Sequence, residues 1–173
     1  MKNRNNVFQA GESQGKSGSF FFFSHDKKFI IKTLQKEEMR TMLKILDSYI
    51  DHIVTLDNKS LLVRIYGLFT IENDYFSNIQ LLLMENTCQN FHDMNIKLFS
   101  FDLKGSIANR RDDIKQGKVL KCMNFVDINS AKKNGLVCLD SEQIEEMYDL
   151  IKKDSEWLRD MNLMDYSLYL VIE

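Results

Sequence analysis

The chain has 173 residues, of which 44% are hydrophobic and 28% are charged, and its formal net charge is −2. This length and composition are typical of one ordinary globular domain, or of two small lobes, with a real hydrophobic core. The near-neutral charge excludes a chain-wide polycation of the histone type, and we expect no nucleic-acid partner. Proline is absent, so we expect the turns to depend on Gly, Asn, Asp and Ser.

The sequence also argues against secretion and against a membrane span. No segment approaches the ~20 continuous apolar residues that cross a bilayer, and the N-terminus lacks the apolar region of a signal peptide. The three cysteines are widely spaced without a CxxC pair, which favours free thiols in a reducing cytosol. The three histidines form no pair at metal-ligand spacing, so we predict no zinc site. We therefore expect a cytoplasmic protein.

Charge is distributed unevenly along the chain. Residues Lys97–Lys133 contain nine Lys or Arg against four Asp, whereas Asn134–Glu173 contains ten Asp or Glu against three Lys or Arg. A basic segment beside an acidic one can steer an anionic partner such as a lipid headgroup or a nucleotide. A solvated loop followed by a helix with an acidic outer face explains the same counts equally well.

The first half of the chain predicts a hairpin followed by a helix. Residues 1–14 are polar and aperiodic, which is typical of a flexible tail, and Gly15–Ser19 is a small-residue loop. An aromatic run predicts a strand over 20–24, and an apolar run predicts a second strand over 28–34. Apolar residues at helical spacing then predict an amphipathic helix over 37–53.

Further strands are predicted over 61–66, 68–71 and 79–84, and the last of these is apolar enough to be central in a sheet. A polar connection at 85–90 then marks a boundary between two lobes.

Beyond this boundary we expect a short strand over 98–103, a strand-like segment at 122–126 and a terminal strand over 168–172. A helix is predicted over 142–161 with Ser141 as its N-cap. There is no internal repeat, and the order of strands and helices indicates an α+β fold.

The segment Gly15-Lys16-Ser17 invites a P-loop interpretation, but the spacing does not fit. Three residues separate Gly11 from Gly15, where the motif needs four. A glycine-rich loop between strands is the better interpretation, because Gly15 and Gly18 would let backbone N–H groups approach the phosphates of a nucleotide. A plain hairpin loop explains the same residues.

Lys32 lies inside an apolar strand, where alternation places it on the same face as Ile30. A buried lysine needs an anionic partner, and either nucleotide phosphates or the carboxylate of Glu38 would serve. The alternative is a lysine on an edge strand whose side chain extends to solvent.

Asp165 lies in a predicted loop between a helix and a strand, among apolar neighbours. A carboxylate there could accept the proton of an attacking hydroxyl, although a turn or cap aspartate is the alternative. Asp102 and Lys104 could form an ion pair at a strand end. The sequence offers no Ser/His/Asp set that would indicate a hydrolase.

Taken together, these segments resemble the catalytic domain of the phosphatidylinositol phosphate kinases, including the phosphatidylinositol-4-phosphate 5-kinases. The resemblance covers roughly residues 15–172, and its most specific motifs are Phe101–Ser106 and Met164–Leu168. The other matching segments are Gly15–Phe23, Phe29–Thr33, Glu38–Leu46, Ser60–Leu68, Leu83–Asn86 and Asp154–Leu158.

This resemblance implies a protein-kinase-like lipid kinase fold with a β-rich N-lobe at about 15–86, containing one main helix, and an incomplete C-lobe at about 87–173. It implies transfer of the γ-phosphate of ATP to a phosphoinositide hydroxyl with Mg²⁺, by a protein that is peripheral to an anionic membrane. Asp165 would be the catalytic-loop aspartate and Lys32 a catalytic, phosphate-holding lysine. The residues implied near ATP are Gly15, Lys16, Ser17, Gly18, Ser19, Lys32, Glu38, Met84, Glu85, Asn86 and Lys104.

The sequence also departs from the family pattern. The acidic Lys-Asp-x-Asp-Phe motif is replaced by Lys121–Phe125, in which both acids are lost. The metal-binding aspartate and the specificity loop of the family lie beyond the catalytic loop, and neither occurs in this sequence. Because metal charge carries much of phosphoryl transfer, we expect these 173 residues to be inactive alone.

Three hypotheses follow. The chain is part of a lipid kinase completed by a further C-terminal segment or a protein partner, or a non-catalytic structural or binding module in a larger assembly, or a nucleotide sensor without turnover.

Overall fold

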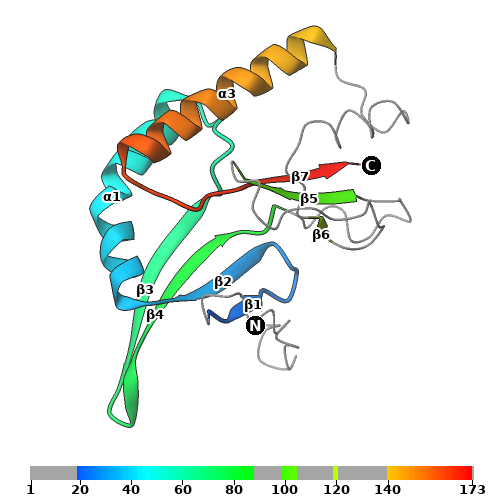
Figure 1. Cartoon of the computed structure of the whole chain (residues 1–173). Coiled ribbons are helices and arrows are strands. Elements are labelled where there is room, and N and C mark those ends of the chain that lie inside the picture. Colours follow the sequence, from blue (N-terminus) through cyan, green and yellow to red (C-terminus); the bar gives the residue numbers. More distant parts are fainter. Residues whose placement is uncertain (1–18, 88–98, 105–118, 121–139, 173) are drawn as a thin grey trace. The chain divides into compact units, whose positions relative to one another are not determined.

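The computed structural model describes residues 19–87, 99–104, 119–120 and 140–172 (Figure 1). The chain divides into two compact units, Met1–Gln89 and Asn90–Glu173. In the part of the chain that the structure describes, neither helix is long and apolar enough to cross a membrane.

Over residues 19–87, the first unit is an antiparallel sheet with one helix (Figure 1). The four strands lie in the order β1-β2-β4-β3, so β4 is central, as predicted for the apolar segment at 79–84. The elements are β1 (Phe21–Phe23), β2 (Phe29–Leu34), α1 (Lys36–Thr55), β3 (Ile65–Asn73) and β4 (Phe76–Glu85).

Helix α1 contributes to the core on one face of this sheet. The strand register places Lys32 opposite Leu82, and Leu82 opposite Leu68, so these three side chains share a face. The core on this face contains buried Leu34, Met39 and Leu82, with Met42, Ile65, Leu68 and Met84 packed against it. Full burial of one such side chain stabilises a fold by about 1.5–3 kcal/mol. Lys32 therefore lies on the apolar, helix-covered face of the sheet.

The turn between β1 and β2 is stabilised by Asp26. Its carboxylate accepts hydrogen bonds from the Ser24 hydroxyl (2.6 Å) and the Lys28 backbone N–H (3.1 Å). The Ser24 hydrogen bond is the main reason why the pKa of Asp26 lies below the usual carboxyl range. Because the pKa is lowered in the folded chain, this stabilisation is present above the ordinary carboxyl pKa and is lost as pH falls through the lowered value.

The strand predicted over 68–71 lies within β3, but its separation from a strand over 61–66 is wrong. A single strand, β3, covers Ile65–Asn73, with a register shift between Ile65 and Gly67. Gly67 does not break the strand; the Phe69 ring lies over it, 2.5 Å from where a Cβ atom would stand. A side chain at this position would meet that ring, which would have to shift to make room for it.

The segment before β3 is held by Tyr49 of α1, in addition to a bond from the Glu85 N–H of β4 to the Arg64 carbonyl (2.9 Å). The Tyr49 hydroxyl donates to the Val63 carbonyl (2.8 Å) and accepts from the Ile65 N–H (3.1 Å). The tyrosine is 7% exposed. One buried hydroxyl thus provides a hydrogen-bond partner for both the Val63 carbonyl and the Ile65 N–H.

In its described residues, the second unit contains a three-stranded sheet in the order β6-β5-β7 and one long helix. Strand β5 is antiparallel to β7 and parallel to β6, and Phe101 of β5 is fully buried. The elements are β5 (Phe99–Leu103), β6 (Val119–Leu120), α3 (Ser141–Asp160) and β7 (Leu168–Ile172).

Helix α3 begins one residue earlier than predicted. Asp140, not Ser141, is the N-cap: its carboxylate accepts from the Gln143 N–H (2.8 Å), and the Gln143 side chain accepts from the Asp140 N–H (3.1 Å). This reciprocal capping box satisfies two backbone donors. Strand β7 has the predicted bounds, β6 was not predicted, and the strand-like segment expected at 122–126 lies outside the described residues.

Both helices end with a left-handed residue other than glycine. After α1, Asp57 and Asn58 have φ values of 50° and 59°; after α3, Asn162 has a φ of 54°. The N–H groups of Asn162 and Leu163 bond back to carbonyls of the last turn of α3, both at 2.9 Å. These are Schellman terminations, and they set the direction in which the chain leaves each helix. Each unit contains a sheet with antiparallel strand pairs and a helix, which confirms the predicted α+β class.

We expect Tyr49→Phe to lower the free energy of unfolding by about 1–3 kcal/mol, because it removes one hydroxyl from two backbone partners in a buried setting. Chemical denaturation provides the measurement. Tyr148→Phe is the matched control, since Tyr148 is 69% exposed, and it should change stability by less than about 0.5 kcal/mol. Equal effects of the two changes would contradict the role given to Tyr49.

Candidate functional site

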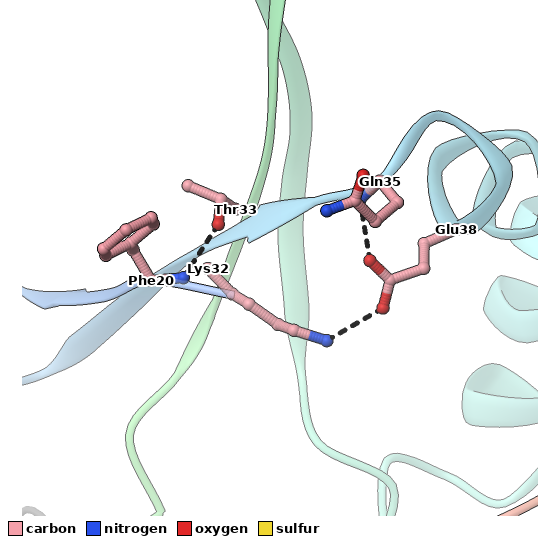
Figure 2. Close-up of polar contacts among 5 residues, drawn as sticks. All are labelled: Phe20, Lys32, Thr33, Gln35 and Glu38. Carbon is pink, nitrogen blue, oxygen red and sulfur yellow. Dashed lines mark hydrogen bonds and ion pairs between the residues drawn. The ribbon is translucent and has the colours of Figure 1, made fainter. Parts of the chain in front are cut away.

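The first candidate group is an ion pair between β2 and α1. The Lys32 ammonium nitrogen lies 3.2 Å from a carboxylate oxygen of Glu38 (Figure 2). The two side chains are 22% and 36% exposed. The sequence allowed nucleotide phosphates or Glu38 as partners of Lys32, and in the structure Glu38 is a partner. The lysine side chain extends from β2 toward the start of α1 (Figure 2).

The other oxygen of Glu38 caps the same helix. It accepts a hydrogen bond from the Gln35 backbone N–H at 2.7 Å (Figure 2). Gln35 has an extended backbone, and its carbonyl accepts the first helical bond, from the Met39 N–H (3.0 Å). An acidic side chain is favourable at this position because the N-terminus of a helix carries partial positive charge. Glu38 thus holds Lys32 with a carboxylate that the helix terminus itself fixes.

Strand β2, which contains Lys32, is also hydrogen-bonded to the residue before β1. The Thr33 N–H donates to the Phe20 carbonyl (3.0 Å). The Phe20 N–H donates to the Thr33 hydroxyl (2.9 Å; Figure 2). The preceding residue, Ser19, is 1% exposed. Of the predicted phosphate-covering loop, Ser19 alone is described and it is buried; Gly15–Gly18 lie outside the described residues.

The three residues predicted beside ATP at the end of β4 have different environments. Met84 packs against the core, and Glu85 is the last residue of the strand. Asn86 is 7% exposed; its side-chain amide donates to the Lys27 carbonyl (2.7 Å) and its backbone N–H to the Lys28 carbonyl (2.9 Å). Asn86 therefore fixes the end of β4 against the hairpin that leads to Lys32.

The second candidate group lies in the second unit, where Lys104 contacts Asp165. Leu103 of β5 pairs with Leu168 of β7, so the residue after β5 lies level with the loop before β7. The Lys104 ammonium donates to the Asp165 backbone carbonyl at 3.0 Å and to its carboxylate oxygen Oδ1. Lys104 is 21% exposed, whereas Asp165 is 87% exposed.

Asp165 occupies the predicted loop between a helix and a strand, but its surroundings differ from those expected. The flanking Met164 and Tyr166 side chains are 89% and 47% exposed, so within this unit they do not enclose the carboxylate. Asp165 also has a left-handed backbone, with φ of 60°. Sequence reasoning placed Lys104 beside a nucleotide and missed its contact with Asp165, for which no local pattern gives a signal.

Known proteins resemble the chain over nearly its whole length. A family model described as phosphatidylinositol-4-phosphate 5-kinase matches residues 2–173. A Dictyostelium discoideum protein named "Probable phosphatidylinositol phosphate kinase" is 35% identical over 99% of this chain and 23% of its own length. Phosphatidylinositol 4-phosphate 5-kinase 1 of Arabidopsis thaliana is 32% identical over 95% of the chain and 21% of its own length.

A further relative has a different printed specificity. Phosphatidylinositol 5-phosphate 4-kinase type-2 gamma of Xenopus tropicalis is 33% identical over 93% of this chain and 37% of its own length. The chain thus spans between about a fifth and somewhat over a third of the length of these relatives. The match over residues 2–173 shows that this α+β chain, with its kinase-like fold, belongs to the phosphatidylinositol-4-phosphate 5-kinase family.

Proposed function

We propose that the complete protein containing this chain transfers the γ-phosphate of ATP to a free hydroxyl of a phosphatidylinositol phosphate headgroup. Membership of the family supports this reaction class, and relatives named as 5-kinases and as a 4-kinase share phosphatidylinositol phosphates as the substrates in their names. The observation that carries the proposal is the Lys32–Glu38 ion pair on the helix-covered face of the sheet.

Lys32 has the properties of a phosphate-binding group. Its ammonium carries three N–H donors, of which the Glu38 bond uses one. A lysine held by a helix glutamate is the arrangement that kinases use to bind ATP phosphates. Since Glu38 is itself fixed by the Gln35 N–H, the ammonium is oriented before a nucleotide arrives.

Asp165 has the properties of the general base. In the proposed step the headgroup hydroxyl attacks the γ-phosphorus and a new O–P bond forms. The bond to the β-phosphate oxygen breaks, ADP leaves, and the hydroxyl proton passes to the Asp165 carboxylate. That side chain is 87% exposed, so a hydroxyl on a group as large as a lipid headgroup can reach it.

Mg²⁺ accompanies ATP in reactions of this class and neutralises developing phosphate charge. Among the residues that the structure describes, no group of three or more His, Cys, Asp or Glu side chains is placed to hold a metal ion. The described residues therefore do not fit a complete metal site, and no step is assigned to the metal.

We further propose that the protein works at the cytoplasmic surface of an anionic membrane. The support is the basic run Lys97–Lys133, which lies mostly outside the described residues and whose charge would favour negative lipid headgroups.

The double role of Glu38 can be separated by two substitutions. Glu38→Gln keeps an oxygen for the Gln35 N–H but loses the charge that holds Lys32, whereas Glu38→Ala loses both. We expect Glu38→Ala to cost about 0.5–2 kcal/mol of unfolding free energy in denaturant titrations, and Glu38→Gln less than about 0.5 kcal/mol, because the partly exposed ion pair is screened by solvent. Both variants should weaken ATP binding. Equal stabilities for the two would count against the capping role.

Removal of the Lys32 ammonium should weaken ATP binding. Since a hydrogen bond to a charged group is worth about 1.5–3 kcal/mol, Lys32→Ala should raise the Kd for ATP by about 10–100-fold in calorimetry. Lys44→Ala, at an exposed position of α1, is the control and should leave the Kd unchanged. An unaltered Kd in Lys32→Ala would reject a phosphate-binding role.

Loss of the general base should slow turnover strongly but leave nucleotide binding intact. In the complete protein, with Mg²⁺ and vesicles containing phosphatidylinositol phosphate, Asp165→Asn should lower kcat by about 10²–10⁴-fold. ATP binding by wild type without lipid phosphorylation would instead favour a nucleotide sensor. Absence of both ATP binding and lipid phosphorylation in wild type would favour a non-catalytic module.

A further inference from the structure

We propose that Lys104 is a positioning residue that fixes the backbone and side chain of Asp165, and that it is not a nucleotide ligand. The inference rests on the proposed function, because it gives the general base its geometry. It is carried by two bonds from one ammonium group to one residue, the first to the Asp165 main-chain carbonyl and the second to its carboxylate.

The sheet explains why these residues meet although they are 61 positions apart in the chain. Pairing of Leu103 with Leu168 ends the β5–β7 ladder at the level of the loop. Lys104 follows directly, and Asp165 lies in the bend just before β7. Buried Phe101 fixes the position of β5, so the Lys104 backbone is attached to a rigid strand.

Asp165 needs such support because its backbone is left-handed. A φ of 60° is unfavourable for L-residues by roughly 1–2 kcal/mol, although aspartate tolerates it better than most. A bond to the carbonyl alone would restrain the peptide, and a bond to the carboxylate alone would restrain the side chain. Lys104 makes both, so it fixes the direction in which the carboxylate points.

The two ends of the segment 163–167 are fixed as well. Asn162 closes the Schellman termination of α3, and Leu168 begins the pairing of β7 with β5. The remaining freedom lies between these two points, where Lys104 contacts Asp165. Because a displacement of a reacting group by about 1 Å can cost ~10²-fold in rate, such a restraint has a direct effect on catalysis.

The charge and exposure of Lys104 agree with this role. Its side chain is 21% exposed, and two of its three N–H donors bond to Asp165. A lysine that mainly bound a nucleotide would have to give up bonds to the proposed general base when the nucleotide arrived.

The kinetic test compares Lys104→Met, Lys104→Arg and a control in the complete protein. Lys104→Met keeps most of the apolar stem but loses the donors, and should lower kcat by about 10–100-fold with the KM for ATP within about twofold of wild type. Lys104→Arg should recover part of kcat. Lys153→Met removes a half-exposed lysine that pairs with Asp149 on α3 and should leave both constants unchanged. A tenfold rise in the KM for ATP with kcat preserved would overturn the inference in favour of a nucleotide contact.

A second measurement is independent of turnover. In the 173-residue chain, the ¹³Cα and ¹³Cβ chemical shifts of Asp165 report its φ, and they should move away from left-handed values in Lys104→Met but not in Lys153→Met. Unchanged shifts in Lys104→Met would refute the positioning role. If wild type shows no kinase activity while these shifts respond as expected, the proposed function fails and the positioning contact stands.

Discussion

The first unit depends on the Glu38 carboxylate, which bonds to two partners at once. One oxygen joins the N-terminus of α1, and the other joins Lys32 on the neighbouring strand. Because the rise per residue in a helix is only 1.5 Å, a shift of α1 by a single residue would break one bond or the other. The orientation of the lysine is therefore linked to the position of the helix, so a ligand or partner that moved α1 would also change how Lys32 presents its charge.

Much of the fold follows from local pattern. The helix predicted over 37–53 lies within α1, and β7 has the predicted bounds, because apolar periodicity and flanking polar residues define both. The errors have non-local causes. The predicted gap between the strands over 61–66 and 68–71 does not occur, because Gly67 lies inside β3 and pairs with Leu83 of β4. The N-cap of α3 is Asp140 rather than Ser141, because only the former is three residues before Gln143, which completes the capping box.

The same distinction holds for the candidate site. Lys32 and Glu38 are six positions apart, so strand alternation and one short connection were enough to suggest their pairing. Lys104 and Asp165 each stood out in the sequence, but their contact needs the register between β5 and β7. No local rule gives that register, since it is set by which residues pack in the second unit.

The distance in sequence between Lys104 and Asp165 has a consequence for the order of folding. Closing a loop of 61 residues costs more entropy than forming α3 or the hairpins, so we expect β7 to pair with β5 after these local elements have formed. During synthesis β5 leaves the ribosome before β7, so at first it has no β7 to pair with. The contact between Lys104 and Asp165 therefore forms only when β7 pairs with β5, which makes the geometry of Asp165 a reporter of that pairing.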